Sequence, residues 1–341
     1  MLRAAYYESK GTIRAGECKP VAPGAGEVQL KVSHCGICGS DLHLFHGAMD
    51  HRVHPPQVIG HEMSGTVAEV GTGVSGFAPG DPVTVRPLDP CGTCPACRAG
   101  HSHVCQHLKF IGIDAPGALQ ARWTVPAHTL HRLPASLPLR RAALVEPLSV
   151  ACHDVRIGGV QPGEFAVVQG GGPIGMLIAA VAREAGARVL ISEVNPFRLK
   201  LARELGFDAC HPREDNLAQR VTAETGGAGA DVVFEVSGSA AGAESMTQLA
   251  RVRGRIVVVA IFAETPKVNL FQFFWRELRL AGARVYEPED FERAIALADS
   301  GRLPLDRLIS QECSLDEVEA ALRRLESGGD VMKVLIRCSE D

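Results

Sequence analysis

Four cysteines lie close together in the segment CGTCPACRAGHSHVC, at positions 91–105. They are Cys91, Cys94, Cys97 and Cys105, with gaps of two, two and seven residues between them. Four thiolates form a complete tetrahedral ligand set for zinc, which leaves no coordination position for a substrate. The segment therefore predicts a structural zinc site rather than a reactive centre.

An iron–sulfur cluster is the alternative reading of the same cysteines. The bacterial ferredoxin run has the spacing C-x2-C-x2-C-x3-C-P. Here the last gap is seven residues long, and Gln106 rather than a proline follows Cys105. The spacing therefore favours zinc, and His101 and His103 are then surplus as ligands.

A second group of candidate ligands is sparser and chemically mixed. Cys38 follows a β-like run, in a glycine-flanked loop that we expect to be mobile. His61 and Glu62 stand where another strand begins, and Glu146 is a further candidate. Catalytic zinc sites use three protein ligands and keep one position for water or substrate. This set of sulfur, nitrogen and oxygen donors predicts a catalytic zinc.

Two polar residues near Cys38 could carry a proton. A zinc ion lowers the pKa of a bound alcohol, and a nicotinamide cofactor accepts the hydride when the alcohol is oxidised. The proton that the alcohol loses needs a route to water. Ser40 and His43, two and five residues after Cys38, could supply a relay from hydroxyl to imidazole.

A glycine-rich turn predicts a dinucleotide site. The run GGGPIG at positions 170–175 contains G-x-G-x-x-G, follows the apolar run FAVVQ directly and opens a helix near Pro173. In this motif Gly170 makes the tight turn, Gly172 admits the pyrophosphate, and Gly175 lets the helix pack on the strand. The free N–H groups of the helix N-terminus then face the phosphates.

The cofactor preference depends on Glu193 and Arg198. Glu193 closes the next apolar run, RVLISE, where an acidic residue binds the ribose 2′-hydroxyl and repels a 2′-phosphate. This position favours NAD over NADP. Arg198 is either a helix-surface charge or a contact on the adenine side, and the NADP alternative depends mainly on it.

The hydrophobic pattern divides the chain in two. The first ~150 residues hold short β-like runs (28–32, 64–71, 81–87 and 121–127) among many glycines, prolines and histidines, which is typical of a β domain with long loops. From about Glu164 apolar runs alternate with helical patterns, which indicates a parallel sheet with helices on both faces. Near the C-terminus, residues 314–338 predict a capped helix followed by a strand.

Composition excludes several classes of function. The 341 residues carry a net charge of −4 and form no basic run, so a nucleic-acid partner is not expected. No apolar run approaches the roughly 20 residues that cross a bilayer, and the first residues lack a signal-peptide pattern. Eleven cysteines, several of them clustered, suit metal binding in a reducing compartment better than a disulfide framework. We expect a cytoplasmic protein.

Five segments together resemble the zinc-containing medium-chain dehydrogenase/reductase superfamily, to which the alcohol dehydrogenases belong. They are GICGSDLH, GHE-x-x-G-x(5)-G-x-x-V (Gly60 to Val74), the four-cysteine segment, EPLSVACH, and GGGPIG with Glu193. The similarity covers essentially the whole chain. The pairing of His61 with Glu62 and the EPLSVACH segment resemble the polyol dehydrogenase branch, which includes sorbitol, L-idonate 5- and 2,3-butanediol dehydrogenases.

This resemblance implies an α/β fold with two domains. A GroES-like β domain would be built from both chain ends, residues 1–147 and 286–341, with a structural zinc lobe near 88–108. A Rossmann domain of doubly wound parallel sheet would span residues 148–285. Such enzymes are commonly dimers or tetramers that oxidise a secondary alcohol of a polyol, sugar acid or diol.

The resemblance also implies a role for individual residues. Cys38, His61 and Glu62 would hold the catalytic zinc, with Glu146 either a ligand or one water away, and the choice between the two carboxylates stays open. Ser40 and His43 match the proton relay. The NAD contacts would come from Gly170, Gly172, Pro173, Ile174, Gly175, Glu193, Arg198, Ala260, Ile261, Phe262, Arg284 and Val285. Two zinc ions per chain and NAD are the expected cofactors.

Departures from the family pattern leave the substrate open. Leu44 stands where sorbitol dehydrogenases often have a pocket tyrosine, and residues 117–123 differ from the usual G-G-F-A-E-Y. An L-threonine dehydrogenase is the nearest alternative, although that family tends to have D-P-F-G where this chain has residues 146–149, EPLS. A non-catalytic NAD-binding sensor would require the loss of a site residue, and none is missing.

Overall fold

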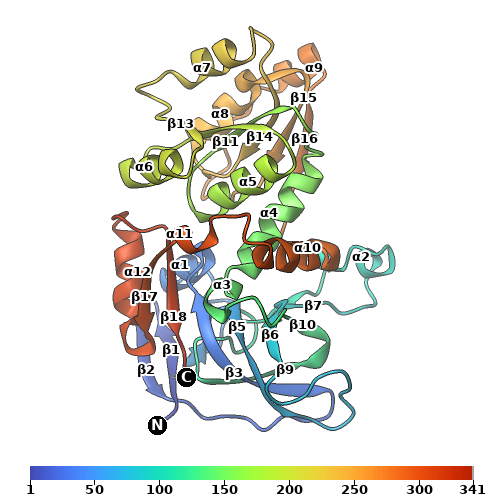
Figure 1. The fold of residues 1–341 in the computed structure, drawn as a ribbon, viewed down its shortest axis with the longest axis vertical. Coiled ribbons are helices and arrows are strands. Elements are labelled where there is room, and N and C mark those ends of the chain that lie inside the picture. Colours follow the sequence, from blue (N-terminus) through green and yellow to red (C-terminus); the bar gives the residue numbers. More distant parts are fainter. Residues whose placement is uncertain (340–341) are drawn as a thin grey trace. The chain divides into compact units, whose positions relative to one another are not determined.

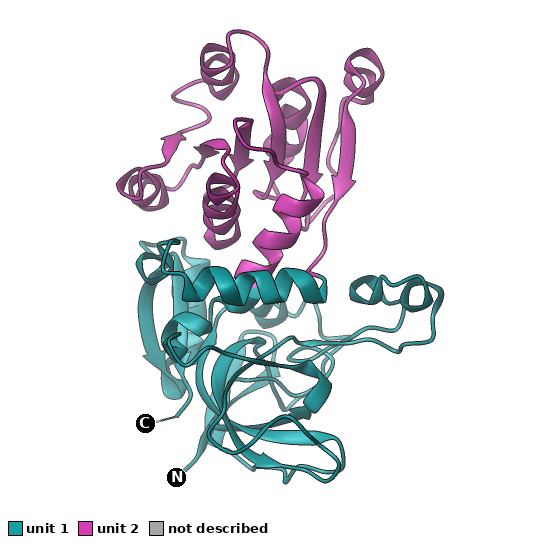
Figure 2. Cartoon of the chain, turned by 45° about the vertical axis from the view of Figure 1, so that its right-hand side comes forward, with its two compact units in different colours: residues 1–146, 287–341 teal, residues 147–286 magenta. Residues whose placement is uncertain are grey.

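The computed structural model describes residues 1–339, which form two compact units. Unit 1 consists of residues 1–146 and 287–341, and unit 2 of residues 147–286 (Figures 1 and 2). Unit 1 therefore contains both ends of the chain, whereas unit 2 is one continuous segment. Helix α4 (Val145–Ile157) begins at the end of unit 1 and continues into unit 2.

Unit 1 is mainly β structure. Its largest sheet has the strand order β10-β6-β5-β3-β18-β17, and β9 also pairs with β3. Strands β2, β1 and β4 form a second sheet in that order, and β7 pairs with β8 in a third. The strands are β1 (Arg3–Ser9), β2 (Thr12–Glu17), β3 (Glu27–Gly36), β4 (Gln57–Val58), β5 (Glu62–Val70), β6 (Pro82–Val85), β7 (Leu88–Asp89), β8 (Lys109–Phe110), β9 (Arg122–Pro126), β10 (Leu130–Arg132), β17 (Ile309–Ser314) and β18 (Lys333–Arg337).

Short helices connect these strands. They are α1 (Gly39–Phe45), α2 (Pro95–Arg98), α3 (Leu139–Ala142), α10 (Pro288–Asp299), α11 (Leu305–Leu308) and α12 (Val318–Glu326), with 3-10 turns η1 (Ser102–Val104), η2 (Ala127–Thr129) and η3 (Leu315–Glu317). The helix and strand expected near the C-terminus are thus α12 and β18. A capping box between Ser314 and Glu317 precedes α12.

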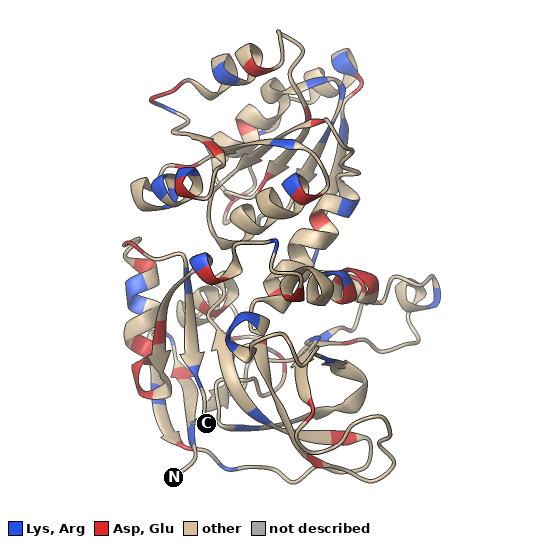
Figure 3. Ribbon diagram, in the orientation of Figure 1, with Lys and Arg blue, Asp and Glu red and all other residues tan. Residues whose placement is uncertain are grey.

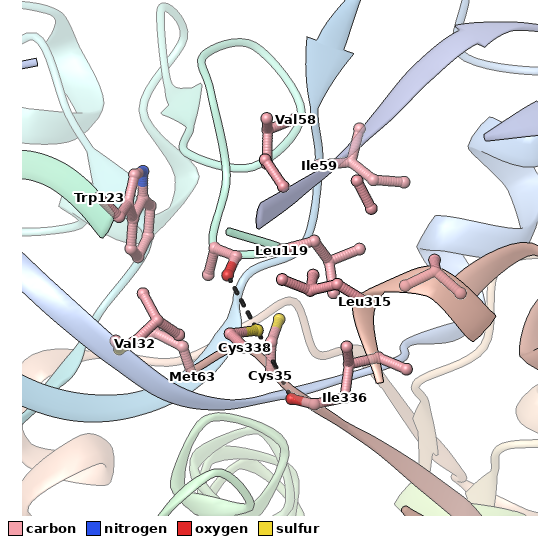
Figure 4. Packing of buried hydrophobic residues seen from close by; sticks show 14 of the residues in the cluster. Val32, Cys35, Val58, Ile59, Met63, Leu119, Trp123, Leu315, Ile336 and Cys338 are labelled. Atoms are coloured by element: carbon pink, nitrogen blue, oxygen red, sulfur yellow. Dashed lines mark hydrogen bonds between the residues drawn. The ribbon is translucent and has the colours of Figure 1, made fainter. Parts of the chain in front are cut away.

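The core of unit 1 follows from alternation along its strands. In β3, Val28, Leu30 and Val32 are fully buried, as expected for one face of a pleated strand. Strand β18 pairs antiparallel with β3 and sets Ile336 opposite Cys35. These side chains belong to one buried hydrophobic cluster (Figure 4). The C-terminal strand is therefore an integral part of the sheet that contains β3 and β5.

Unit 2 is a six-stranded parallel sheet with the order β13-β12-β11-β14-β15-β16. The strands are β11 (Phe165–Gln169), β12 (Arg188–Ser192), β13 (Asp208–Cys210), β14 (Ala230–Glu235), β15 (Ala250–Val258) and β16 (Arg279–Gly282). The helices are α5 (Pro173–Glu184), α6 (Pro196–Glu204), α7 (Leu217–Glu224), α8 (Ala240–Leu249) and α9 (Leu270–Arg276). All five residues of β11 are buried, as in strands covered on both faces.

The surface carries both charge signs. Lysine and arginine are interspersed with aspartate and glutamate on the helices of each unit (Figure 3). Ion pairs such as Arg323 with Glu319 on α12 and Arg220 with Glu224 on α7 join them locally. Among residues 1–339, no helix is long and apolar enough to span a membrane.

Candidate metal centres and nucleotide site

The sparse ligand group meets at one end of strands β3 and β5. Cys38 precedes α1, His61 precedes β5, and Glu62 is the first residue of β5. Their ligand atoms all lie within 4.8 Å of one another. His61 and Glu62 are buried, whereas Cys38 is partly accessible. Residues 23 positions apart in sequence (38 and 61) are thus brought together by the antiparallel pairing of β3 with β5.

Both glycines that flank Cys38 belong to regular elements. Gly36 is the last residue of β3 and Gly39 the first of α1, so neither lies in the loop that was expected. Gly36 has a steric role instead, because a Cβ there would lie 2.2 Å from Glu62 Oε2. The glycine lets the Glu62 carboxylate approach the backbone of β3.

Asp41 lies beside His61 and adds negative charge to the site. Its carboxylate accepts a hydrogen bond from the Cys38 N–H at 2.9 Å, and its other oxygen lies 3.7 Å from His61 Nδ1. Burial alone would lower the pKa of His61, but Asp41, Cys38 and Glu146 raise it to about 10. A potential that favours an imidazolium also favours a metal cation. Asp41 was not predicted as a site residue, although it lies within GICGSDLH.

Lys333 is a second residue that the sequence did not identify. Its ammonium group forms a buried ion pair with Glu62 and donates a hydrogen bond to the Ile37 carbonyl at 2.9 Å. Burial lowers the pKa of Lys333, but Glu62 and Cys38 outweigh that effect and raise it. Lys333 lies on β18, and only the folded sheet brings it to Glu62.

The other expected residues lie at different distances from this group. Glu146 is buried and acts electrostatically on His61 and Lys333, but it is outside the set whose ligand atoms meet. The Ser40 hydroxyl lies 3.4 Å from His61 Nε2. His43 is exposed on α1, three residues after Ser40, and such a pair shares one side of a helix.

The arrangement of the candidate ligands and their neighbours fits a zinc ion. Asp41 Oδ1 and His61 Nδ1 are buried without a hydrogen-bond partner among the described residues, and they face each other. An imidazole whose second nitrogen faces a carboxylate is the usual arrangement of a metal-bound histidine. Sulfur, nitrogen and oxygen donors in an acidic environment are the ligands of catalytic zinc.

The four-cysteine segment forms a closed cluster. The Sγ atoms of Cys94 and Cys97 lie 3.5 Å apart, those of Cys94 and Cys105 3.8 Å, and those of Cys105 and Cys91 3.5 Å. Zinc–sulfur bonds of about 2.3 Å in a tetrahedron require sulfur separations of roughly 3.8 Å. The segment therefore fits a zinc site with four cysteine ligands.

The thiol pKa values of this cluster also favour a cation. Hydrogen bonds from backbone N–H groups, chiefly that of Thr93, lower the pKa of Cys91 to about 6. Burial, together with the neighbouring Cys94 and Cys105, raises the pKa of Cys97 to about 12. Four thiolates so close together repel one another, and a bound cation removes that penalty.

The glycine turn of unit 2 has the form that the sequence predicted. Gly170 has φ +106 after β11, and α5 begins at Pro173 with Gly172 as its N-cap and Ile174 in its first turn. A Cβ on Gly175 would lie 1.8 Å from the Gly170 carbonyl oxygen. Only glycine at this position permits the close packing of α5 against the turn.

Glu193 is held rigidly beside the turn. Its carboxylate accepts hydrogen bonds at 2.7 Å from the N–H groups of Gly171, Val194 and Asn195. Arg198 lies in the first turn of α6, and both residues line a cavity that also includes Gly170 and Gly172. The cavity opens at the carboxyl ends of the strands, where open parallel sheets bind ligands.

The remaining expected cofactor contacts follow two further strands. Ala260, Ile261 and Phe262 come after β15, and Arg284 and Val285 come after β16. The Ala260 N–H donates to the Glu235 carbonyl at 3.1 Å, and Val285 has φ +49. These residues lie at the same edge of the sheet as the glycine turn, but they do not line the cavity beside Glu193.

Two family models match this chain. The alcohol dehydrogenase GroES-like domain matches residues 24–135, and the zinc-binding dehydrogenase model matches residues 173–300. The chain belongs to the zinc-binding dehydrogenases of the alcohol dehydrogenase family, and it is an oxidoreductase. The predicted class, a GroES-like β domain with a Rossmann domain, is confirmed.

Curated relatives match over nearly the full chain. A 2-dehydro-3-deoxy-L-galactonate 5-dehydrogenase of Pseudoalteromonas atlantica is 53% identical over 99% of both chains. A sorbitol dehydrogenase of Halalkalibacterium halodurans is 35% identical over 92% of both. An L-threonine 3-dehydrogenase of Pyrococcus horikoshii is 35% identical over 90% of both.

Solved structures agree with the fold. The 2R,3R-butanediol dehydrogenase of Bacillus subtilis superposes with a TM-score of 0.91 at 29% identity, over 99% of this chain and 100% of that one. A structure from Sinorhizobium meliloti 1021 bound to NADP has a TM-score of 0.93 at 34% identity and covers 99% of both chains. The chain is thus similar to polyol, diol and sugar-acid dehydrogenases.

Proposed function

We propose that this chain is a zinc- and NAD-dependent dehydrogenase that oxidises a secondary hydroxyl of a sugar acid. The substrate class is supported by the 53% identity, over 99% of both chains, to a 2-dehydro-3-deoxy-L-galactonate 5-dehydrogenase. The favoured substrate is therefore a 2-dehydro-3-deoxy aldonate, whose hydroxyl becomes a ketone.

In this proposal unit 1 supplies the metal site. Cys38, His61 and Glu62 hold the catalytic zinc, and their convergence within 4.8 Å supports the assignment. When bound, zinc acts as a Lewis acid that lowers the pKa of the substrate hydroxyl. Glu146, which lies outside this set, contributes negative charge. Cys91, Cys94, Cys97 and Cys105 hold a second, structural zinc.

The substrate proton leaves through α1. Ser40 accepts it at the hydroxyl that lies beside His61, and the exposed imidazole of His43 releases it to water. Asp41 keeps the His61 ring in place during this transfer. These two steps need only side chains that α1 already positions.

Unit 2 supplies the cofactor site. NAD, when bound, accepts the hydride. The turn at Gly170, Gly172 and Gly175 receives the pyrophosphate, and Glu193 accepts hydrogen bonds from the adenosine ribose. Since three N–H groups fix the Glu193 carboxylate, it cannot easily turn away from a 2′-phosphate. This rigidity supports NAD over NADP, although the relative from Sinorhizobium meliloti binds NADP.

We also propose a cytoplasmic homo-oligomer, either a dimer or a tetramer. All eleven cysteines are free thiols, which suits a reducing compartment. On α9, Phe271, Phe274 and Trp275 are 60–77% exposed, and such apolar surface is typical of a protein contact. The mass in solution, measured by light scattering, would distinguish the oligomers from a monomer.

A substrate comparison tests the proposal. Formation of reduced nicotinamide is measured with 2-dehydro-3-deoxy-L-galactonate, sorbitol, 2,3-butanediol and L-threonine, each with NAD and with NADP. We expect the highest kcat/KM for the sugar acid with NAD. A higher kcat/KM for L-threonine would favour the alternative that the 35% identical relative from Pyrococcus horikoshii suggests.

A further inference from the structure

Unit 1 has a cavity of its own, and basic side chains line it. Its volume is about 550 Å³, within the range of small-molecule sites. The basic lining residues are Arg3, Lys31, Arg122 and Arg337. Asp316 is the one carboxylate among the lining residues that the structure describes, and none of the candidate metal ligands belongs to the lining. Because the whole chain carries a net charge of −4, this concentration of cations does not follow from its composition.

Three of these cations project from one face of the largest sheet. Lys31 lies between two core residues of β3, and Arg337, at the end of β18, lies between two more. Arg122, the first residue of β9, precedes the core residue Trp123 (Figure 4). Since successive side chains of a strand point to opposite faces, all three cations lie on the face away from this core. They are accessible there, Lys31 and Arg122 in part and Arg337 with 59% of its side chain.

Lys31 and Arg122 form an unfavourable cross-strand pair. They stand directly opposite each other in the antiparallel pairing of β3 with β9. Side chains in such positions have Cβ atoms roughly 5 Å apart, and like charges there destabilise a sheet. A pair of this kind needs a counter-ion, or the sheet bears the cost of the repulsion.

The carboxylates near the cavity pair with the other two cations. Among residues 1–339, Arg3 forms an ion pair with Asp316, and Arg337 Nη1 lies 4.0 Å from Glu312 Oε1. Within the same described part of the chain, the cross-strand pair has no such carboxylate partner. An anion in the cavity would supply the missing negative charge.

We propose that this cavity binds a small oxyanion with at least two negative charges, a phosphate or a dicarboxylate. The Arg122 guanidinium presents paired donors that match two oxygens of either group, and Lys31 adds a point charge beside it. Arg337 contributes a third cation from β18. An anion between Lys31 and Arg122 replaces their repulsion with attraction, so its binding stabilises the sheet. The inference does not depend on the proposed function, because it requires neither zinc nor a dinucleotide.

Calorimetric titration of the full chain with two probes tests the inference. The probes are inorganic phosphate and succinate, each mainly a dianion at about pH 8, at constant ionic strength. We expect wild type to bind at least one of them about tenfold more tightly than Lys31→Gln with Arg122→Gln, because charge-assisted hydrogen bonds are lost. The probe that binds shows whether the site takes phosphate or carboxylate. If neither bound, or if wild type and the double variant bound equally, the inference would be overturned.

Two controls assign the binding to the cavity. Lys10→Gln with Arg14→Gln changes the net charge equally at exposed residues of unit 1 outside the lining, so wild-type affinity is expected. Glu340→Gln with Asp341→Asn removes the carboxylates that follow the lining residue Ser339 in the sequence, and it should also keep wild-type affinity. Probe binding in that variant alone would overturn the inference, because the chain's own carboxylates would then fill the cavity.

Thermal unfolding provides an independent measurement. Without a probe, Lys31→Gln should unfold at a higher temperature than wild type, since it removes the like-charge contact with Arg122. Phosphate should raise the unfolding temperature of wild type more than that of the variant, because a ligand that binds the folded state stabilises it. A lower unfolding temperature of the variant without a probe, or an equal effect of phosphate on both proteins, would overturn the inference.

Discussion

At the residue scale, two charged side chains that were not predicted as site residues lie against the candidate metal ligands of unit 1. Asp41 faces His61 and accepts from the Cys38 N–H, and Lys333 forms a buried ion pair with Glu62. Neither side chain belongs to the candidate ligand set, and each contacts a member of it. The candidate site is therefore a network of buried charges in which Asp41 faces His61 and Lys333 pairs with Glu62.

We predict that Asp41→Asn weakens zinc binding at this site. The substitution keeps the size of the side chain but removes the charge that faces His61, and loss of such a partner typically costs about 10–100-fold in metal affinity or activity. Zinc content after dialysis and kcat measure the effect. Asp81→Asn, at a half-buried carboxylate paired with Arg132, is the control and should leave both unchanged. Normal zinc retention in Asp41→Asn would contradict this role.

The titration of His61 predicts how zinc removal changes the pH dependence of stability. The pKa of His61 is raised from 6.5 to about 10, so the protonated ring stabilises the folded zinc-free protein. This contribution is complete below pH 6.5 and is lost as the pH rises toward 10. Urea denaturation of the zinc-free protein should therefore show falling stability across that interval.

Zinc-loaded protein is the comparison for that experiment. A zinc-bound imidazole is neutral, so the fall attributed to His61 should be absent when the metal is present. If the zinc-free protein kept constant stability between pH 6.5 and 10, His61 would not be the group that titrates.

The residues that the sequence revealed are those with a local spacing. The four cysteines, the glycine turn and Glu193 were predicted from short segments, because each chemistry needs neighbours at fixed intervals. Lys333 could not be predicted in this way, since it lies 271 positions after Glu62 in the sequence. Its partner becomes apparent only when β18 pairs with β3.

At the element scale, glycines set how closely the site-bearing segments approach. Gly36 lets Glu62 come near β3, and Gly175 lets α5 pack against the turn after β11. The packing role of Gly175 was predicted from the G-x-G-x-x-G pattern. The role of Gly36 was not predicted, because a glycine in a strand and a glycine in a loop look alike until the strand is paired.

We predict that Gly175→Ala destabilises unit 2 and abolishes tight cofactor binding. The new Cβ would lie 1.8 Å from the Gly170 carbonyl oxygen, so the turn or the helix must move. Overpacking of this kind typically costs about 1–3 kcal/mol of unfolding free energy. Thermal unfolding and NADH titration check the prediction.

Gly282→Ala provides the matched control for Gly175→Ala. A Cβ at Gly282 meets nothing within 4 Å, so the same chemical change should leave stability and NADH affinity close to wild type. Equal behaviour of the two variants would show that the packing of α5 on the turn is not what the third glycine protects.

At the scale of the whole molecule, the candidate metal ligands lie in unit 1, whereas the glycine turn and Glu193 lie in unit 2. The alternation of apolar runs with helical patterns predicted the parallel sheet of unit 2, because each strand and helix there is a local unit of sequence. Only the resemblance to a known family predicted that the C-terminal segment belongs to the β domain of unit 1. Pairing between strands from opposite ends of the chain leaves no local signal.

In the proposed mechanism, Cys38, His61 and Glu62 hold the zinc at which the alcohol is oxidised. The most direct measurement compares zinc content, turnover and NADH affinity in wild type, Cys38→Ser and Cys97→Ser. We predict two zinc ions per wild-type chain and one in Cys38→Ser, which should lose turnover and keep NADH binding. Cys97→Ser should lose the other zinc. Unchanged turnover in Cys38→Ser would contradict the account.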